Sequence, residues 1–192
     1  MEFLKQYFNS ISPISEETWN ALSKLFKPRT LKAKEYFVEE SKRATEIAFL
    51  ETGCVRAFFT NKKAKEYNKQ FFVGPSLIGA YTSLLTKEKN LIPQQALTGC
   101  TLFVAKFSEL EKLFSEFHDF ERLGRKIAEF YFLEKEKKEL EMALMDASER
   151  YILFREKFPS LEQLIPQYEI ASYLGVSATQ LSRLRNNLAK QS

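Results

Sequence analysis

Side chains that can hydrogen-bond to the edges of DNA bases gather between residues 177 and 187. At about 100° per residue, a helix in this segment would place Leu181, Leu184 and Leu188 on one apolar stripe. The opposite side would carry Thr179, Ser182, Arg183 and Asn186. Side chains of these types donate to and accept from base edges in the major groove. The spacing therefore predicts a helix that packs with one side and reads DNA with the other.

A further helix is predicted immediately before this one. Apolar residues recur at helical spacing through residues 168–174, and Gly175 ends the helix because glycine tolerates the left-handed conformation. Ser177 and Gln180 form a Ser-x-x-Gln capping box that opens the next helix. Two short helices joined by a glycine turn are typical of a helix-turn-helix motif, whose second helix lies in the major groove. The alternative is a small helical hairpin without a DNA function.

Local charge agrees with a DNA-binding role. From Ala178 to the end, the sequence carries Arg183, Arg185 and Lys190 and no acidic residue, a balance that suits a polyanion. Arg183 can hold a guanine through two hydrogen bonds or a phosphate through charge, and the sequence leaves both roles open. Gln180 likewise caps its own helix or contacts a base. The predicted DNA-binding residues are Gln167, Ser177, Thr179, Gln180, Ser182, Arg183, Arg185 and Asn186.

The composition of the whole chain is that of an ordinary folded protein. It has 192 residues, 44% of them hydrophobic, and its net charge of +4 is too small to indicate nucleic-acid binding by itself. The sequence contains neither a secretion signal nor a membrane-spanning run, so we expect a cytoplasmic protein without a membrane partner. Cys54 and Cys100 lie in apolar runs and are predicted to be reduced core thiols.

The single histidine, His118, argues against an enzyme. Histidine-rich metal sites cannot be assembled from it, and a serine or cysteine nucleophile would depend on this one base. A jelly-roll metalloenzyme would need a cluster of ligands that one histidine does not supply. We therefore expect no catalytic residue, no metal site and no cofactor.

The elements that must position the DNA reader change character along the chain. Apolar spacing predicts short helices over residues 3–11 and 15–26. Runs rich in Val, Phe, Tyr and Thr then alternate with turn signals, which is typical of an antiparallel sheet. The predicted strands are 30–38, 46–51, 54–60, 66–72 and 94–107. Their spacing predicts a small jelly-roll β-barrel.

A long helix is predicted from about residue 120 to 145. Its apolar stripe comprises Leu123, Ile127, Phe130, Leu133, Leu140 and Leu144. Such a stripe packs against the barrel or pairs with the same helix of a second chain, and we expect both. The six residues would then support a homodimer.

The predicted fold class is α+β, in three parts. Residues 1–119 would form the jelly-roll domain with its N-terminal helices, residues 120–146 the dimerisation helix, and residues 147–192 the helix-turn-helix domain. These parts together predict a homodimeric, sequence-specific DNA-binding protein. The alternative is a small-molecule sensor whose helical tail contacts other proteins.

This order of parts resembles the Crp/Fnr family of cyclic-AMP receptor and fumarate-nitrate regulators over essentially the whole chain. The motifs that carry the resemblance are ERY at 149–151, IASYLGVSATQLSRLR at 170–185, ETGCVR at 51–56 and FFVGPSLIGAYTSLL at 71–85. They are particularly similar to the short members found in Bacteroidetes. The resemblance implies a homodimeric transcription regulator of double-stranded DNA, with RNA polymerase as a candidate partner.

The effector cassette departs from the family pattern. Members that bind cyclic nucleotides use a Gly-Glu pair for the ribose and an arginine for the phosphate, whereas here the pair is Gly79-Ala80. No arginine occurs between Arg56 and Arg122, so we expect no cyclic-AMP binding. The altered pocket either holds another, unknown small molecule or is a filled core without a ligand. The candidate pocket residues are Gly79, Ala80, Tyr81, Ser83, Gln94 and Gln95.

Family members often continue into a β-wing that touches phosphate. Only four residues follow Leu188 in this sequence, so no wing is expected. Backbone contacts would then come from Gln167, Ser177 and Arg185 or from the partner subunit.

Overall fold

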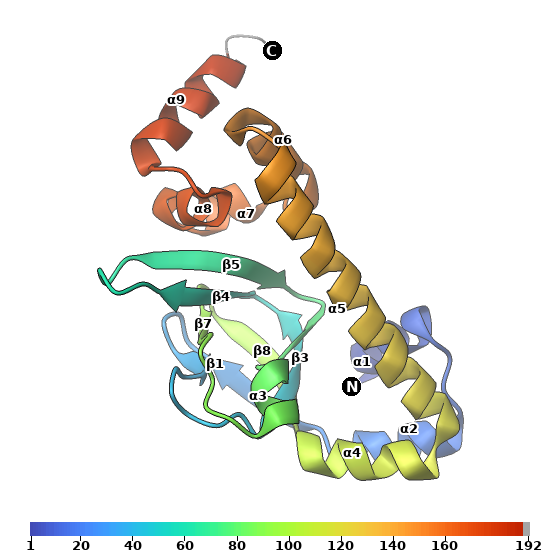
Figure 1. Ribbon diagram of the computed structural model, residues 1–192. Coiled ribbons are helices and arrows are strands. Elements are labelled where there is room, and N and C mark those ends of the chain that lie inside the picture. The colour runs from blue at the N-terminus through green and yellow to red at the C-terminus, as the bar shows by residue number, and fades with distance from the viewer. Residues whose placement is uncertain (190–192) are drawn as a thin grey trace. The chain divides into compact units, whose positions relative to one another are not determined.

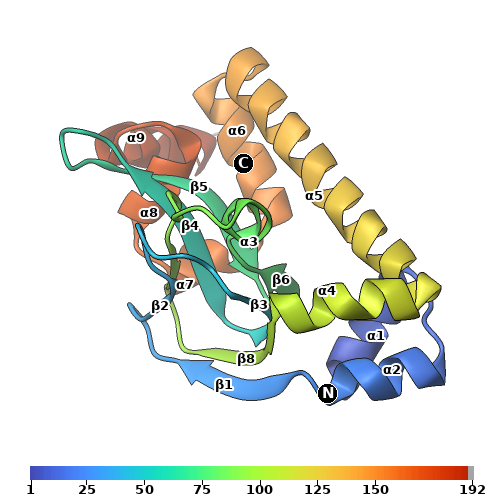
Figure 2. The same ribbon diagram turned by 60° about the horizontal axis from the view of Figure 1, so that its bottom comes forward.

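The computed structural model describes residues 1–189 and contains two compact units. The first unit comprises residues 1–57 and 71–133. The second comprises residues 58–70 together with the chain from 134 onward. The division into parts at residues 119 and 146 stays a prediction, and the inclusion of residues 58–70 in the second unit was not expected from the sequence. Figures 1 and 2 show the elements in two views.

Two short helices open the first unit, as predicted. They are α1 (Glu2–Ile11) and α2 (Glu16–Ser23). The Ser15 hydroxyl accepts a hydrogen bond from the Thr18 amide at 3.1 Å and so caps α2. The Asp119 carboxylate accepts from the Ser15 amide and the Thr18 hydroxyl, each at 2.7 Å. The start of α2 is thereby tied to a residue about a hundred positions away.

The strands lie in two antiparallel four-stranded sheets, with the orders β1-β8-β3-β6 and β2-β7-β4-β5. Their bounds are β1 Lys27–Leu31, β2 Tyr36–Val38, β3 Glu46–Thr52, β4 Cys54–Thr60, β5 Glu66–Val73, β6 Ser76–Ile78, β7 Gln94–Ala96 and β8 Cys100–Lys106. Within the described residues the sheets do not close into a barrel, so the jelly-roll assignment stays a prediction. The antiparallel sheet region itself is confirmed.

Two of the predicted strands are each divided in the structure. The strand predicted over 30–38 is wrong in its centre, because a turn at Lys34, with φ of 73°, separates β1 from β2. The strand predicted over 94–107 is interrupted at residues 97–99, where the Thr98 hydroxyl accepts from the Cys54 amide at 2.9 Å. At the tight turn before β4, Gly53 has φ of +100°, and a Cβ there would lie 2.4 Å from the Gly99 carbonyl oxygen. Glycine is therefore required at this turn.

Alternating strand residues supply the core of the sheets. Leu50, Val55 and Leu102 are fully buried in one apolar cluster between strands. Both cysteines are buried thiols, as predicted, and burial raises the pKa of Cys100.

The remaining helices of the chain are α3 (Tyr81–Thr86), α4 (Phe107–Glu116), α5 (His118–Leu144), α6 (Ala147–Lys157), α7 (Leu161–Leu164), α8 (Gln167–Leu174) and α9 (Ala178–Ala189). The long predicted helix corresponds to α5. Asp146 caps α6 with a complete capping box, in which the Glu149 side chain accepts from the Asp146 amide at 2.8 Å. In the second unit, Tyr151, Phe154 and Leu174 are buried.

Candidate nucleic-acid interface

The turn between α8 and α9 has the geometry that the sequence predicts. Gly175 adopts the left-handed conformation, with φ of 72° and ψ of 26°. The Val176 amide donates to the Ala171 carbonyl at 3.0 Å, which is the bond that closes a glycine C-cap. The chain therefore leaves α8 and enters α9 within three residues, and the two helices stay in contact.

The capping box at the start of α9 is confirmed. The Ser177 hydroxyl accepts from the Gln180 amide at 3.1 Å. The Gln180 side-chain oxygen in turn accepts from the Ser177 amide at 2.9 Å and from its hydroxyl at 3.1 Å. Both side chains were predicted to contact DNA, yet both are committed to the helix start, where together they satisfy amides that α9 leaves unpaired.

The two sides of α9 differ as the spacing predicts. Leu181 is completely buried, and Leu184 and Leu188 are half-buried. The opposite side carries Thr179, Ser182, Arg183 and Asn186, all exposed. The helix therefore presents short hydroxyls, an amide and one guanidinium to solvent.

The other predicted contacts are placed less directly. Gln167 is the exposed first residue of α8. Arg185 is half-buried, and its Nε lies 3.8 Å from the Glu162 carboxylate, so a phosphate contact would compete with this ion pair. Lys190 lies outside the described residues.

The buried side of α8 makes a contact that sequence reasoning missed. Glu169 is only 3% exposed, and the Asn68 side-chain amide donates to its carboxylate at 2.6 Å and to its carbonyl at 2.9 Å. Asn68 lies in β5, within the 58–70 segment that belongs to the second unit. The one signal in the sequence was an acid directly beside the apolar stripe of α8, which does not reveal its partner.

A second buried polar group lies at the end of α5. The Lys138 ammonium lies 3.7 Å from the centre of the Tyr173 ring and 3.7 Å from the carboxylate of Glu141, which is buried. Burial lowers the pKa of Lys138 to about 8, although Glu141 partly opposes this shift. Burial also raises the pKa of Tyr173. These groups pack the end of α5 against α8.

The residues predicted for dimerisation divide into two groups. Leu123 is completely buried in the core of its own chain, so the expectation that it contacts a partner is wrong. Ile127 packs against the same core. The other four are exposed: Phe130 55%, Leu133 65%, Leu140 59% and Leu144 78%. The apolar surface that α5 leaves uncovered therefore begins at residue 130.

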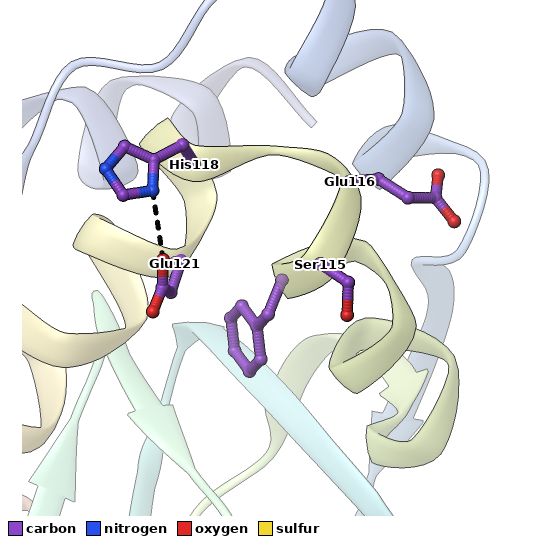
Figure 3. Close-up of a pocket in the computed structure, with 5 residues that line it drawn as sticks. Ser115, Glu116, His118 and Glu121 are labelled. Carbon is purple, nitrogen blue, oxygen red and sulfur yellow. Dashed lines mark hydrogen bonds and ion pairs between the residues drawn. The ribbon is translucent and has the colours of Figure 1, made fainter.

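The single histidine lines a hollow at the junction of α4 and α5 (Figure 3). His118 Nδ1 lies 3.0 Å from the Glu121 carboxylate, and both side chains are exposed. Among residues 1–189, no group of three or more His, Cys, Asp or Glu side chains has an arrangement that fits a metal ion. In the same residues, no helix is long and apolar enough to cross a membrane.

Comparison with known proteins identifies the fold. No protein-family model and no curated protein matches the sequence. Among solved structures, FixK2 from Bradyrhizobium japonicum superposes with a TM-score of 0.77 at 17% identity, over 86% of this chain and 85% of FixK2. The fold is that of the Crp/Fnr regulators.

Other structures of this Crp/Fnr fold agree. The c-di-GMP responsive global regulator CLP of Xanthomonas campestris gives a TM-score of 0.71 at 16% identity, over 92% of this chain and 93% of CLP. A putative Crp/Fnr regulator from Eubacterium rectale gives 0.72 at 11% identity, over 93% of this chain and 85% of that protein. These identities are low, so the likeness concerns the fold.

Within the Crp/Fnr fold, two of the six predicted effector residues, Ser83 and Gln95, are hydrogen-bonded to their own chain. The Ser83 hydroxyl donates to the Glu88 carbonyl at 2.6 Å and accepts from the Ala44 amide at 3.0 Å. The Gln95 side-chain oxygen accepts from the Arg56 Nη2 at 2.8 Å and Nε at 3.1 Å.

The other four effector candidates are placed as follows. Ala80 is buried, whereas Tyr81 is 46% exposed and packs edge-on against the ring of Phe107. A Cβ on Gly79 would lie 3.2 Å from the Ile47 side chain. Gln94 is buried, and its side-chain oxygen accepts no hydrogen bond from the described residues.

Proposed function

We propose that the chain is a homodimeric, sequence-specific DNA-binding transcription regulator of the Crp/Fnr type, with α9 as its recognition helix. The observation that carries the proposal is the division of α9 into a buried side at Leu181 and an exposed side of Thr179, Ser182, Arg183 and Asn186. A helix that is fixed by its apolar side to α8 presents those side chains rigidly. Rigid donors and acceptors are what base recognition requires.

The proposed roles within α9 follow from what each side chain already contacts. Thr179 and Arg183 are exposed and lie about one turn apart, so they reach neighbouring base pairs. Ser177 and Gln180 serve the helix start. A helix start also offers backbone amides to a phosphate, so these two residues support DNA binding by holding the helix end in shape.

The proposed dimer uses the exposed part of α5. Phe130, Leu133, Leu140 and Leu144 are separated by three, seven and four residues, the spacing of a two-helix seam, and all four are more than half exposed. A second copy of α5 is the partner that matches such a stripe. A dimer of this kind carries two recognition helices and suits an approximately palindromic site with half-sites one helical turn apart.

The effector domain is proposed not to bind cyclic AMP. Its position for the family's Gly-Glu pair is Gly79-Ala80, and the hydroxyl of Ser83 already bonds within the chain. Arg56 is buried, and its guanidinium donates to Gln95. A cyclic phosphate would have to displace that bond to obtain a cationic partner.

Selection of bound fragments from random DNA tests the function directly. We expect recovery of a palindromic sequence, and Arg183→Ala should weaken binding by about 1–3 kcal/mol and relax the preference at one base pair. Arg125→Ala is the matched control, because it removes the same charge from an exposed position of the first unit, and it should leave both affinity and sequence preference unchanged. Recovery of no preferred sequence by the native protein would refute the proposal. Equal weakening on every sequence would assign Arg183 to a phosphate.

A further inference from the structure

The tip of the β4–β5 hairpin, residues 58–70, is held against α8 by four hydrogen bonds. Asn68 donates from its side chain to the Glu169 carboxylate and carbonyl, and from its backbone to the Ser172 hydroxyl at 3.0 Å. The Ser172 hydroxyl donates in turn to the Glu66 carbonyl at 3.0 Å. Asn68 and Glu169 are both buried, so the two bonds between them are shielded from water. The hairpin tip is therefore fixed to the first helix of the proposed DNA reader.

The end of the hairpin is a tight turn that holds two lysines outward. The Asn61 side-chain oxygen accepts from the amides of Lys63 at 2.9 Å and Lys65 at 3.1 Å. The Asn61 amide donates to the Lys65 carbonyl at 3.0 Å. Lys62 and Lys63, at the apex, are exposed. The turn thus presents two ammonium groups on a shaped loop.

The charge of this tip is strongly one-sided. Residues 58–70 contain four lysines and one glutamate, a balance of +4 and −1 that leaves +3. None of the ion pairs seen among residues 1–189 involves Lys62 or Lys63. Figure 1 draws the hairpin alongside α8, the helix to which these hydrogen bonds attach it. Two uncompensated cations therefore lie at the end of a hairpin that is bonded to α8, the first helix of the proposed DNA reader.

We propose that Lys62 and Lys63 bind the DNA phosphate backbone beside the bases that α9 reads. This inference rests on the proposed function and adds a second contact element to it. Phosphate contacts set the position and register of a reader, and lysine binds phosphate as a point charge without demanding one geometry. The bonds of Asn68 and Ser172 hold the loop at a constant distance from α8, so it would engage the same phosphates in each complex. An acidic protein surface is the competing partner.

The test compares Lys62→Ala/Lys63→Ala with the native protein on the DNA fragment recovered by selection. Affinity is measured by fluorescence anisotropy at several salt concentrations. If each lysine neutralises one phosphate, the slope of log affinity against log salt falls by about 0.9 per lysine in each half-site, and affinity at moderate salt falls at least roughly ten-fold. The same loss should occur on unrelated DNA, because phosphates carry no sequence. Lys62→Arg/Lys63→Arg should retain both slope and affinity.

Two controls make the result decisive. Lys24→Ala/Lys112→Ala removes the same charge from exposed positions of the first unit, and should leave the slope unchanged if the effect is local. Thermal unfolding of each variant checks that the fold is kept. A native protein without any sequence preference would overturn the proposed function itself. A native protein that selects DNA, with Lys62→Ala/Lys63→Ala indistinguishable from it in slope and affinity, would overturn the hairpin contact alone and favour the acidic protein partner.

Discussion

Lys138 makes the stability of the second unit vary with pH in the alkaline range. Its pKa is about 8 in the folded chain and 10.5 when exposed, so between these values the unfolded state binds more protons. Stability therefore rises with pH across this window. Integrating the difference in bound protons from pH 8 to pH 10 gives an increase of about 2 kcal/mol in the free energy of unfolding. Tyr173 has a raised pKa, so above its usual value of 10.0 it makes the free energy of unfolding fall as the pH rises. This opposite effect sets the upper limit of the pH window.

The assay is urea unfolding at pH 8, 9 and 10, for the native protein and for Lys138→Met. The substitution keeps a long apolar chain over the Tyr173 ring and removes the titrating group. It also leaves the buried Glu141 without this cation, so the absolute stability of the variant is not the readout. The readout is the change with pH, which should be about 2 kcal/mol smaller in Lys138→Met. An identical pH profile in both proteins would show that the ammonium is not desolvated in the folded chain.

Four further outcomes are expected. Asn68→Ala should lower the free energy of unfolding, measured in urea, by about 2 kcal/mol, since a buried carboxylate loses its donor. Asn68→Asp should lower the free energy of unfolding further, because it places a second carboxylate beside Glu169. Gly175→Val should cost about 1–2 kcal/mol or more, because a branched residue would have to adopt a positive φ; an unchanged melting temperature would contradict this. Gln180→Ala should cost about 0.5–1 kcal/mol of stability and leave the selected DNA sequence unaltered. Leu133→Lys/Leu140→Lys should convert a dimer to monomers in sedimentation without loss of helix content, and a persistent dimer would exclude this surface.

The parts of the candidate site that the sequence predicted are those that local physics controls. The capping box, the glycine turn and the two sides of α9 all depend on residues that are close together in the sequence, and each has the predicted geometry. The docking of the hairpin on α8 depends instead on Asn68 and Glu169, which are 101 residues apart. No periodicity links such residues. The turn at Lys34 escaped prediction for a related reason, because its residues continue the strand-like pattern on either side.

The apolar stripe on α5 was predicted correctly, but not all of its residues face a possible partner. Leu123, Phe130 and Leu144 lie at multiples of seven residues, and an α-helix drifts by about 20° per heptad relative to such a repeat. Over three heptads the stripe turns by about 60°, so residues read as one face point in gradually different directions. Leu123, at its start, faces the core of its own chain, whereas Leu144, at its end, is 78% exposed. One stripe therefore serves two purposes in succession. The first two turns anchor the helix in the first unit, and the surface proposed for the partner begins only at Phe130.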